Sequence, residues 1–301
     1  MLMKRTPLMI MLAVLSTSLF TACHHENPDP VTPDPTDTSQ ISKNLLAKTV
    51  LTSGSGVTTK IYQYDAQNRL AWYSNTSTEP GYFEDTSKIV WDASGHIAQI
   101  IYSSDTSTFR FPDPKVDSVV YNVFYDAAAS KYTYKLTQYT MFPNTAYAAK
   151  FKDSAVYTYD AQSHISQVND YYFDYKTTKT YVKWATYDYT YNDKGDLTNW
   201  KTTYYNIDNN NTNYPFEKVY TYEEKGVNVL SLGNDAIVIG IPENYGAHAP
   251  KTITGTYPLN PEYNSTLTFN YNYNTLYRPL SAAITDAADN NAKSTMVYTY
   301  Q

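Results

Sequence analysis

Three histidines, His96, His164 and His248, are the residues that could act as general bases. A general base needs a partner that orients it and tunes its pKa. His96 and His164 occupy one position of a repeated phrase, and Arg69 and Asp196 stand at that position in other copies. A position that accepts either charge is typical of a solvated site after a turn. His248 lies outside the phrase and has no nucleophile motif beside it. We therefore expect that the protein is not an enzyme.

Two patterns of polar side chains could bind a metal ion. The turns of the repeat carry Asp65, Asp92 and Asp160, but each turn supplies about one carboxylate, whereas calcium needs six or more converging oxygens. His24 and His25 are adjacent, in a segment without the ligand spacing of a built site. We expect no metal and no other cofactor.

Aromatic side chains outside the repeated phrase are the candidates for ligand binding, because an aromatic face can stack on a sugar ring and a Tyr adds a hydroxyl. The alternative is that they pair across strands and fill the core of a sheet. The candidates are Trp72, Trp184, Trp200, Tyr204 and Tyr205.

The elements that would position these residues are visible when the chain is aligned with itself. The clear copies are IYQYDAQNRL (61–70), KIVWDASGHI (88–97), AVYTYDAQSHI (155–165), YDYTYNDKGDL (187–197) and VYTYEEKGVNVL (219–230). Residues 122–134 and 269–280 are degenerate copies, and VYTYQ (297–301) is a half copy. Alternating aromatics in each copy predict a strand with its rings on one face.

A turn follows each of these strands. Asp65, Asp92, Asp160 and Asn192 come directly after the aromatic residue, where a short side chain can start an Asx turn. Residues that tolerate a positive φ stand three positions later. They are Asn68, Gly95, Ser163 and Gly195, with Gly226 near the same phase. An apolar residue then restarts the strand, at Leu70, Ile97, Ile165 or Leu197, so each copy predicts a β-hairpin.

This phrase resembles the YD repeats of Rhs-type proteins and, more closely, the Tyr-rich surface lipoproteins of Bacteroidota. Some of those belong to a family of unknown function with a porin-like β-barrel. The resemblance covers about residues 57–301, and the stretch GIPENYGAHAPKTIT (240–254) is similar to one that such lipoproteins carry before their last strands. It implies a curled antiparallel meander and no activity.

The copies predict an all-β fold, an antiparallel meander of repeated hairpins. About two strands per copy gives roughly fourteen, more than an open twisted sheet usually keeps, so we expect a barrel or half-barrel. The final VYTYQ could pair with the first strand and remove an open edge. Lys183, Asp188 and Lys201 interrupt any continuous apolar band, which argues against insertion as a pore. Segment 227–256 departs from the repeat, and we expect it to plug or cover the concave face.

The N-terminus has the features of an export signal. Lys4 and Arg5 precede an apolar run at 8–20 that is too short to span a bilayer. The sequence before Cys23 resembles the lipobox of bacterial lipoproteins, and Phe20 argues against ordinary signal peptidase cleavage after Ala22. We predict a signal peptide at 1–22, lipidated Cys23 with a disordered tether at 23–43, and one β-repeat domain at 44–301.

Composition limits the partners. A net charge of −6 without a basic block excludes nucleic acid as an expected partner. The single cysteine excludes a disulfide framework within the chain. We expect a lipid-anchored outer-membrane protein, on the cell surface or the periplasmic face, that acts as a binding or structural module, with glycan as the candidate ligand. The alternatives are an accessory partner of an outer-membrane complex, or a hydrolase with an unrecognised site.

Overall fold

The computed structural model describes residues 45–54, 56–78, 85–104, 119–141, 149–174, 178–205, 214–289 and 292–301. The predicted signal peptide, Cys23 and the tether lie outside these residues. The strands are β1 (Leu46–Ser53), β2 (Gly56–Tyr64), β3 (Leu70–Ser77), β4 (Asp85–Trp91), β5 (Ile97–Ser104), β6 (Val119–Asp126), β7 (Lys131–Met141), β8 (Ala149–Tyr159), β9 (Ile165–Phe173), β10 (Tyr181–Tyr191), β11 (Leu197–Tyr204), β12 (Tyr214–Val227), β13 (His248–Thr256), β14 (Ser265–Tyr273), β15 (Pro279–Asp286) and β16 (Ala292–Tyr300). The helical elements are α2 (Asn234–Ile239), η3 (Pro242–Asn244) and η4 (Pro261–Tyr263).

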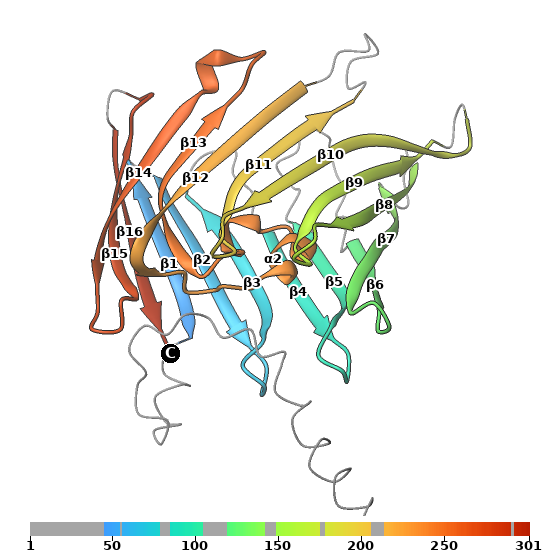
Figure 1. Cartoon of the computed structure of the whole chain (residues 1–301), viewed down its shortest axis with the longest axis horizontal. Coiled ribbons are helices and arrows are strands. Elements are labelled where there is room, and N and C mark those ends of the chain that lie inside the picture. Colours follow the sequence, from blue (N-terminus) through green and yellow to red (C-terminus); the bar gives the residue numbers. More distant parts are fainter. Residues whose placement is uncertain are drawn as a thin grey trace, which may run out of the picture. The chain divides into compact units, whose positions relative to one another are not determined.

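These strands form one closed antiparallel barrel in which each strand pairs with its neighbours in sequence (Figure 1). β16 pairs with β1, with Val297 opposite Val50, so the final VYTYQ segment removes the open edge as expected. The prediction of an antiparallel hairpin meander is confirmed, and the barrel is closed. The expected count of about fourteen strands was too low, since the described residues form sixteen.

The turns that join β2 to β3, β4 to β5, β8 to β9 and β10 to β11 are the predicted Asx turns. In the first of them, Asp65 Oδ1 accepts hydrogen bonds from the backbone N–H groups of Gln67 and Arg69, both at 2.9 Å. Asp92, Asp160 and Asn192 repeat this pair of bonds. The predicted left-handed residues have positive φ: Asn68 61°, Gly95 88°, Ser163 69° and Gly195 79°.

The prediction for Gly226 was wrong. Gly226 lies inside β12 and its φ is not positive. Glu223 stands where the other copies have Asp or Asn, and its longer side chain does not form an Asx turn. The strand therefore continues to Val227.

At the barrel end that carries these turns, which we call the turn rim, aromatic side chains connect neighbouring strands. Tyr159 of β8 donates from its hydroxyl to the backbone carbonyl of Tyr132 on β7 at 2.9 Å. The backbone pairing of these two strands has already ended at Tyr134 and Val156. The other bonds of this kind are Tyr64 to Leu46, Trp91 to Leu70, Tyr191 to Ile165, Tyr222 to Leu197, Tyr271 to Pro250 and Tyr300 to Pro279. In these seven cases an aromatic side chain near the end of a strand thus donates a hydrogen bond to a backbone carbonyl of the preceding strand.

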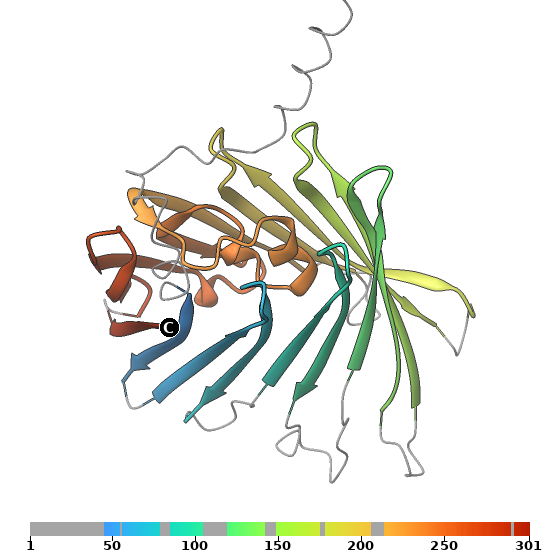
Figure 2. The same ribbon diagram turned by 90° about the horizontal axis from the view of Figure 1, so that it is seen from below.

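Residues 228–247, which we call the plug, lie inside the barrel (Figure 2). Ala236, Ile237, Val238 and Ile239 of α2 are buried in one core with the apolar residues that restart the strands. Those strand residues are Leu46, Leu70, Ile97, Ile165 and Leu197, each at most 1% exposed. The expected plug is therefore present, but segment 227–256 was too long, because His248–Thr256 is strand β13 of the barrel wall.

None of the helices within the described ranges is long and apolar enough to cross a membrane.

Candidate functional site

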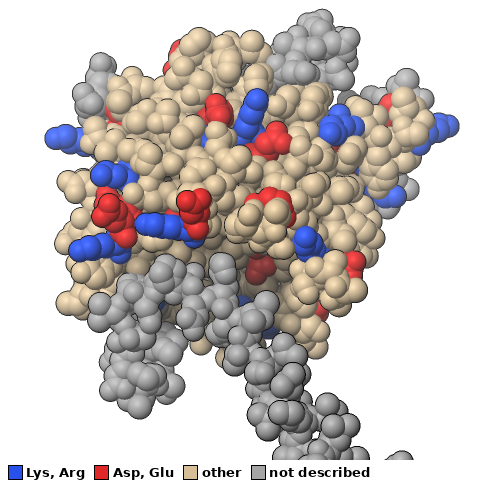
Figure 3. Space-filling model, viewed as in Figure 1, with Lys and Arg blue, Asp and Glu red and all other residues tan. Residues whose placement is uncertain are grey.

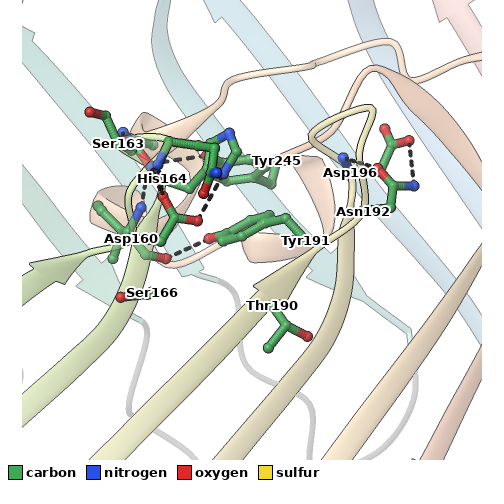
Figure 4. Close-up of polar contacts among 12 residues, drawn as sticks. Asp160, Ser163, His164, Ser166, Thr190, Tyr191, Asn192, Asp196 and Tyr245 are labelled. Atoms are coloured by element: carbon green, nitrogen blue, oxygen red, sulfur yellow. Dashed lines mark hydrogen bonds and ion pairs between the residues drawn. The ribbon is translucent and has the colours of Figure 1, made fainter.

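The plug is attached to the turn rim by specific hydrogen bonds (Figure 4). The Asn234 side chain accepts from the backbone N–H of Ile165 at 2.8 Å and donates to the Ser163 carbonyl at 2.9 Å. The Tyr245 hydroxyl donates to the same Asn234 oxygen at 3.2 Å. The Tyr245 ring packs on Tyr191, with ring centroids 4.5 Å apart. The plug is thus fixed against the turns of β8–β9 and β10–β11.

The histidines lie at these junctions. His164 Nδ1 is 3.1 Å from Asp160 Oδ2, and His248 Nδ1 is 2.9 Å from Asp196 Oδ2. Asp196 also accepts from the backbone N–H of His248 at 3.1 Å. The expectation of a solvated position after the turn was wrong for Asp196, whose side chain is only 1% exposed because the plug-to-β13 junction covers it. The Asp196–His248 contacts hold the β10–β11 turn against the end of the plug, whereas the His164–Asp160 contact lies within one turn. They give no arrangement of nucleophile and base.

A polar cluster extends from the plug into the lumen. Lys135 Nζ donates to the Val238 carbonyl of α2 at 3.1 Å, and its charge also acts on Asp170. Burial raises the pKa of the Asp170 carboxyl, while Lys135 and a hydrogen bond from Tyr187 oppose that rise. Burial also lowers the pKa of Lys135. The Asp170 carboxyl in the lumen wall is therefore shielded from solvent and is influenced by both an opposite charge and a hydrogen bond.

Next to this cluster, strands β10–β13 carry a continuous set of rings that we call the aromatic wall. It consists of Trp184, Tyr187, Tyr189, Trp200, Tyr204, Phe216 and Tyr257. Phe216 lies at its centre, with its ring centroid 5.6 Å from Trp200 and 5.5 Å from Tyr257. Tyr189 also belongs to the core around the plug, so this face of the strands points into the barrel. At the edges of the wall, Trp184 is exposed, and Tyr204 and Tyr257 are half-buried.

Buried polar atoms of the lumen wall lack hydrogen-bond partners among the described residues. They are Trp200 Nε1, Thr202 Oγ1 and the Tyr157 hydroxyl, with Asn75 Oδ1 and the Tyr273 hydroxyl elsewhere. Thr202 pairs with Tyr187 across β10 and β11, so it faces the lumen beside Trp200. A buried polar group without a partner costs free energy, and such groups mark places where a bound molecule can supply the missing bond.

A cation lies directly over this part of the wall. Lys218 Nζ is 4.7 Å from the centre of the Trp200 ring. Burial lowers the pKa of Lys218, while the charge of Glu243 from the plug opposes that shift. Trp200 therefore presents a ring, an unpartnered donor and a neighbouring ammonium in one place.

The structure brings together some of the predicted ligand residues and separates others. Trp184, Trp200 and Tyr204 are neighbours in the aromatic wall. Tyr205 follows Tyr204 and faces the opposite side of the sheet. Trp72 lies on β3, away from the aromatic wall.

Contacts around Tyr205 and Trp72 place both side chains on the outer face. The Tyr205 hydroxyl donates to Thr186 Oγ1 at 3.2 Å, in a polar network that includes Asn169. Trp72 is opposite two exposed residues, Gln63 and Lys88, and therefore points outward.

Sequence reasoning missed Lys135, Asp170, Tyr157 and Lys218. Lys135 and Asp170 come from different hairpins and share no motif, so only the strand order brings them together. Tyr157 belongs to the repeat, and nothing in the phrase distinguishes it from Tyr residues whose hydroxyls are bonded.

The outer face of the barrel carries polar and charged side chains together with exposed apolar ones, among them Ile61, Phe124, Val156, Val219 and Val297. Asp188, Lys201 and Glu217 lie side by side on β10, β11 and β12. Hydroxyls of Thr221 and Thr252 contact each other at 2.6 Å on the exposed side of β12 and β13. Figure 3 shows Lys, Arg, Asp and Glu side chains spread across one side of the barrel, with both signs of charge mixed.

Comparison with known proteins identifies a solved structure with a similar fold. No family matches the sequence, and no curated protein matches it. The structure is similar to that of a porin-like protein from Bacteroides vulgatus ATCC 8482, with a TM-score of 0.50 and 11% identity, covering 86% of this chain and 99% of that one. A porin-like protein from Bacteroides uniformis ATCC 8492 gives a TM-score of 0.48 and 11% identity, over 86% of this chain and 98% of that one. At this identity the likeness shows a shared barrel fold alone. Membership of the Tyr-rich lipoproteins stays a prediction.

Proposed function

We propose that this barrel is a carbohydrate-binding module of the cell envelope that holds a sugar against the aromatic wall. The observation that carries the proposal is Trp200, which offers a ring face and an unpartnered Nε1 donor beside Lys218. Sugar rings present C–H faces that pack on aromatic rings, and hydroxyls that both donate and accept hydrogen bonds. The unpartnered Thr202 and Tyr157 hydroxyls would be further partners for such a ligand.

The proposed location is outside the bilayer, with attachment through lipid on Cys23. A barrel that spans a membrane needs an outward apolar band about 25 Å tall flanked by aromatic girdles. Asp188, Lys201 and Glu217 form a charged row on the outer face of β10, β11 and β12 and would interrupt an apolar band on these strands. The lipobox-like sequence before Cys23 supports a lipid anchor instead.

The test is a glycan array followed by calorimetric titration of the sugar that binds. Trp200→Phe keeps an aromatic face, although a smaller one, and removes the Nε1 donor, so it should fold and bind several-fold more weakly. Trp200→Ala should lose about tenfold or more, because the stacking face is removed as well. The matched control is Trp72→Ala, which removes a tryptophan from the outer face and should leave affinity unchanged.

Three outcomes would contradict the proposal. The first is an array without any binding glycan. The second is loss of affinity in Trp72→Ala but not in Trp200→Ala, which would place binding on the outer face. The third is release of new reducing ends from a bound glycan, which would favour the hydrolase hypothesis. Capture of an outer-membrane protein after mild crosslinking, with no glycan bound, would instead favour the accessory-partner hypothesis.

A further inference from the structure

A cavity of about 250 Å³ lies between the plug and strands β1, β2 and β13–β16. Val229 and Glu243 line it from the plug, and Leu51, Phe269 and Met296 line it from the barrel wall. None of the aromatic wall residues lines this cavity. It is therefore a separate part of the lumen from the proposed sugar site.

Two opposite charges face this otherwise largely apolar space. Lys60 reaches it from β2 and Glu243 reaches it from η3. In the part of the chain that the structure describes, neither side chain forms an ion pair within 4.0 Å. At longer range, the charge of Lys60 opposes the rise that burial causes in the pKa of the Asp85 carboxyl. Burial lowers the pKa of Lys218, the charge of Glu243 opposes that shift, and the charge of Lys60 adds to it. An ammonium and a carboxylate that face a largely apolar space favour a ligand that carries both charges and an apolar body.

We propose that this cavity binds a small zwitterion with an apolar body, namely an apolar α-amino acid, with its carboxylate toward Lys60 and its ammonium toward Glu243. The volume fits this class, because an apolar cavity of about 150 Å³ is enough to hold benzene. The additional space would accommodate the charged end of leucine or phenylalanine. A neutral apolar ligand would leave both charges unpaired, and a fatty acid would pair its carboxylate with Lys60 but leave Glu243 without a cation.

The experiment is calorimetric titration of the purified protein with L-leucine and L-phenylalanine. N-acetyl-L-leucine lacks the ammonium and L-leucinamide lacks the carboxylate, so each should bind about tenfold more weakly than leucine. Glu243→Gln should remove the preference for leucine over N-acetyl-leucine, and Lys60→Met should remove the preference for leucine over leucinamide. Lys88→Met, at an exposed position of β4, is the matched control and should keep both preferences.

Met296→Trp should abolish binding of leucine, because the larger side chain fills the cavity. The proposal is overturned if neither amino acid binds at about 10 mM, or if octanoate binds as tightly as leucine. Unchanged leucine binding in Met296→Trp, with the variant folded, would also overturn it. The sugar titration is a separate measurement on the aromatic wall, so failure of one does not imply failure of the other.

Discussion

Tyr157 and Tyr159 lie two residues apart on the same face of β8, but only the Tyr159 hydroxyl has a hydrogen-bond partner in the described structure. Replacing Tyr159 by Phe keeps the ring, and with it the contact to Lys131, but leaves the Tyr132 carbonyl without its donor. The lost bond and the unsatisfied acceptor together should cost about 1–2 kcal/mol of unfolding free energy. Replacing Tyr157 by Phe removes a buried donor that has no acceptor, so it should leave stability unchanged or raise it slightly.

Urea unfolding of the wild type and both variants, followed by tryptophan fluorescence, measures this difference. Tyr159→Phe should lower the urea concentration at the midpoint of unfolding. In a thermal melt it should lower the melting temperature by several degrees, since about 1 kcal/mol shifts the melting temperature of a domain of this size by roughly 2–4 °C. Equal effects of the two substitutions would refute the assignment of rim hydroxyls as structural bonds. Tyr157→Phe should also weaken sugar binding without weakening the fold, a combination that a purely structural role for Tyr157 would not produce.

Other predictions concern the plug and the turns. Gly246→Ala should destabilise the barrel by about 1–3 kcal/mol, because a Cβ at this position would lie 2.8 Å from the Asp196 Cα. The control is Gly255→Ala, whose Cβ would meet nothing closer than 3.6 Å, so this variant should be tolerated. Thermal unfolding of both variants tests this difference. The backbone N–H of His96, with other turn amides, lowers the pKa of the Asp92 carboxyl in the folded protein. The ionised carboxylate therefore stabilises the fold at any pH above its unfolded pKa of about 3.9. This stabilisation is lost as the pH falls through the lower pKa of the folded state. Asp92→Asn should keep the turn, as Asn192 does naturally, and should reduce the loss of stability below about pH 4; an unchanged acid dependence would contradict this.

The fold was predictable because the repeated phrase contains its own turn chemistry. Asp65 and its equivalents, followed by a residue that tolerates positive φ, specify hairpins locally, and alternating aromatics specify which face is inside. The phrase also predicted the copy at 219–230 incorrectly. Glu223 replaces the Asx residue there, and this one change lets β12 continue and send the chain into the lumen.

The candidate site could be predicted only in part. Trp184, Trp200 and Tyr204 stood out as aromatics outside the phrase, and they do lie together. Which face each ring occupies depends on register, so sequence could not separate Trp200 from Trp72. The Lys135–Asp170 pair depends on the order of strands around the barrel, which no local pattern encodes.

Closure of the barrel has a kinetic consequence. β1 and β16 are the first and last strands of the sheet, and Leu46 is opposite Tyr300. The final ladder therefore joins residues at the greatest possible separation along the domain, a contact that is slow to form because of its large loop-closure entropy. Until β16 emerges, β1 and β15 expose unpaired edges that can pair with other chains. A chain that lacks β16 should therefore aggregate rather than form a smaller barrel.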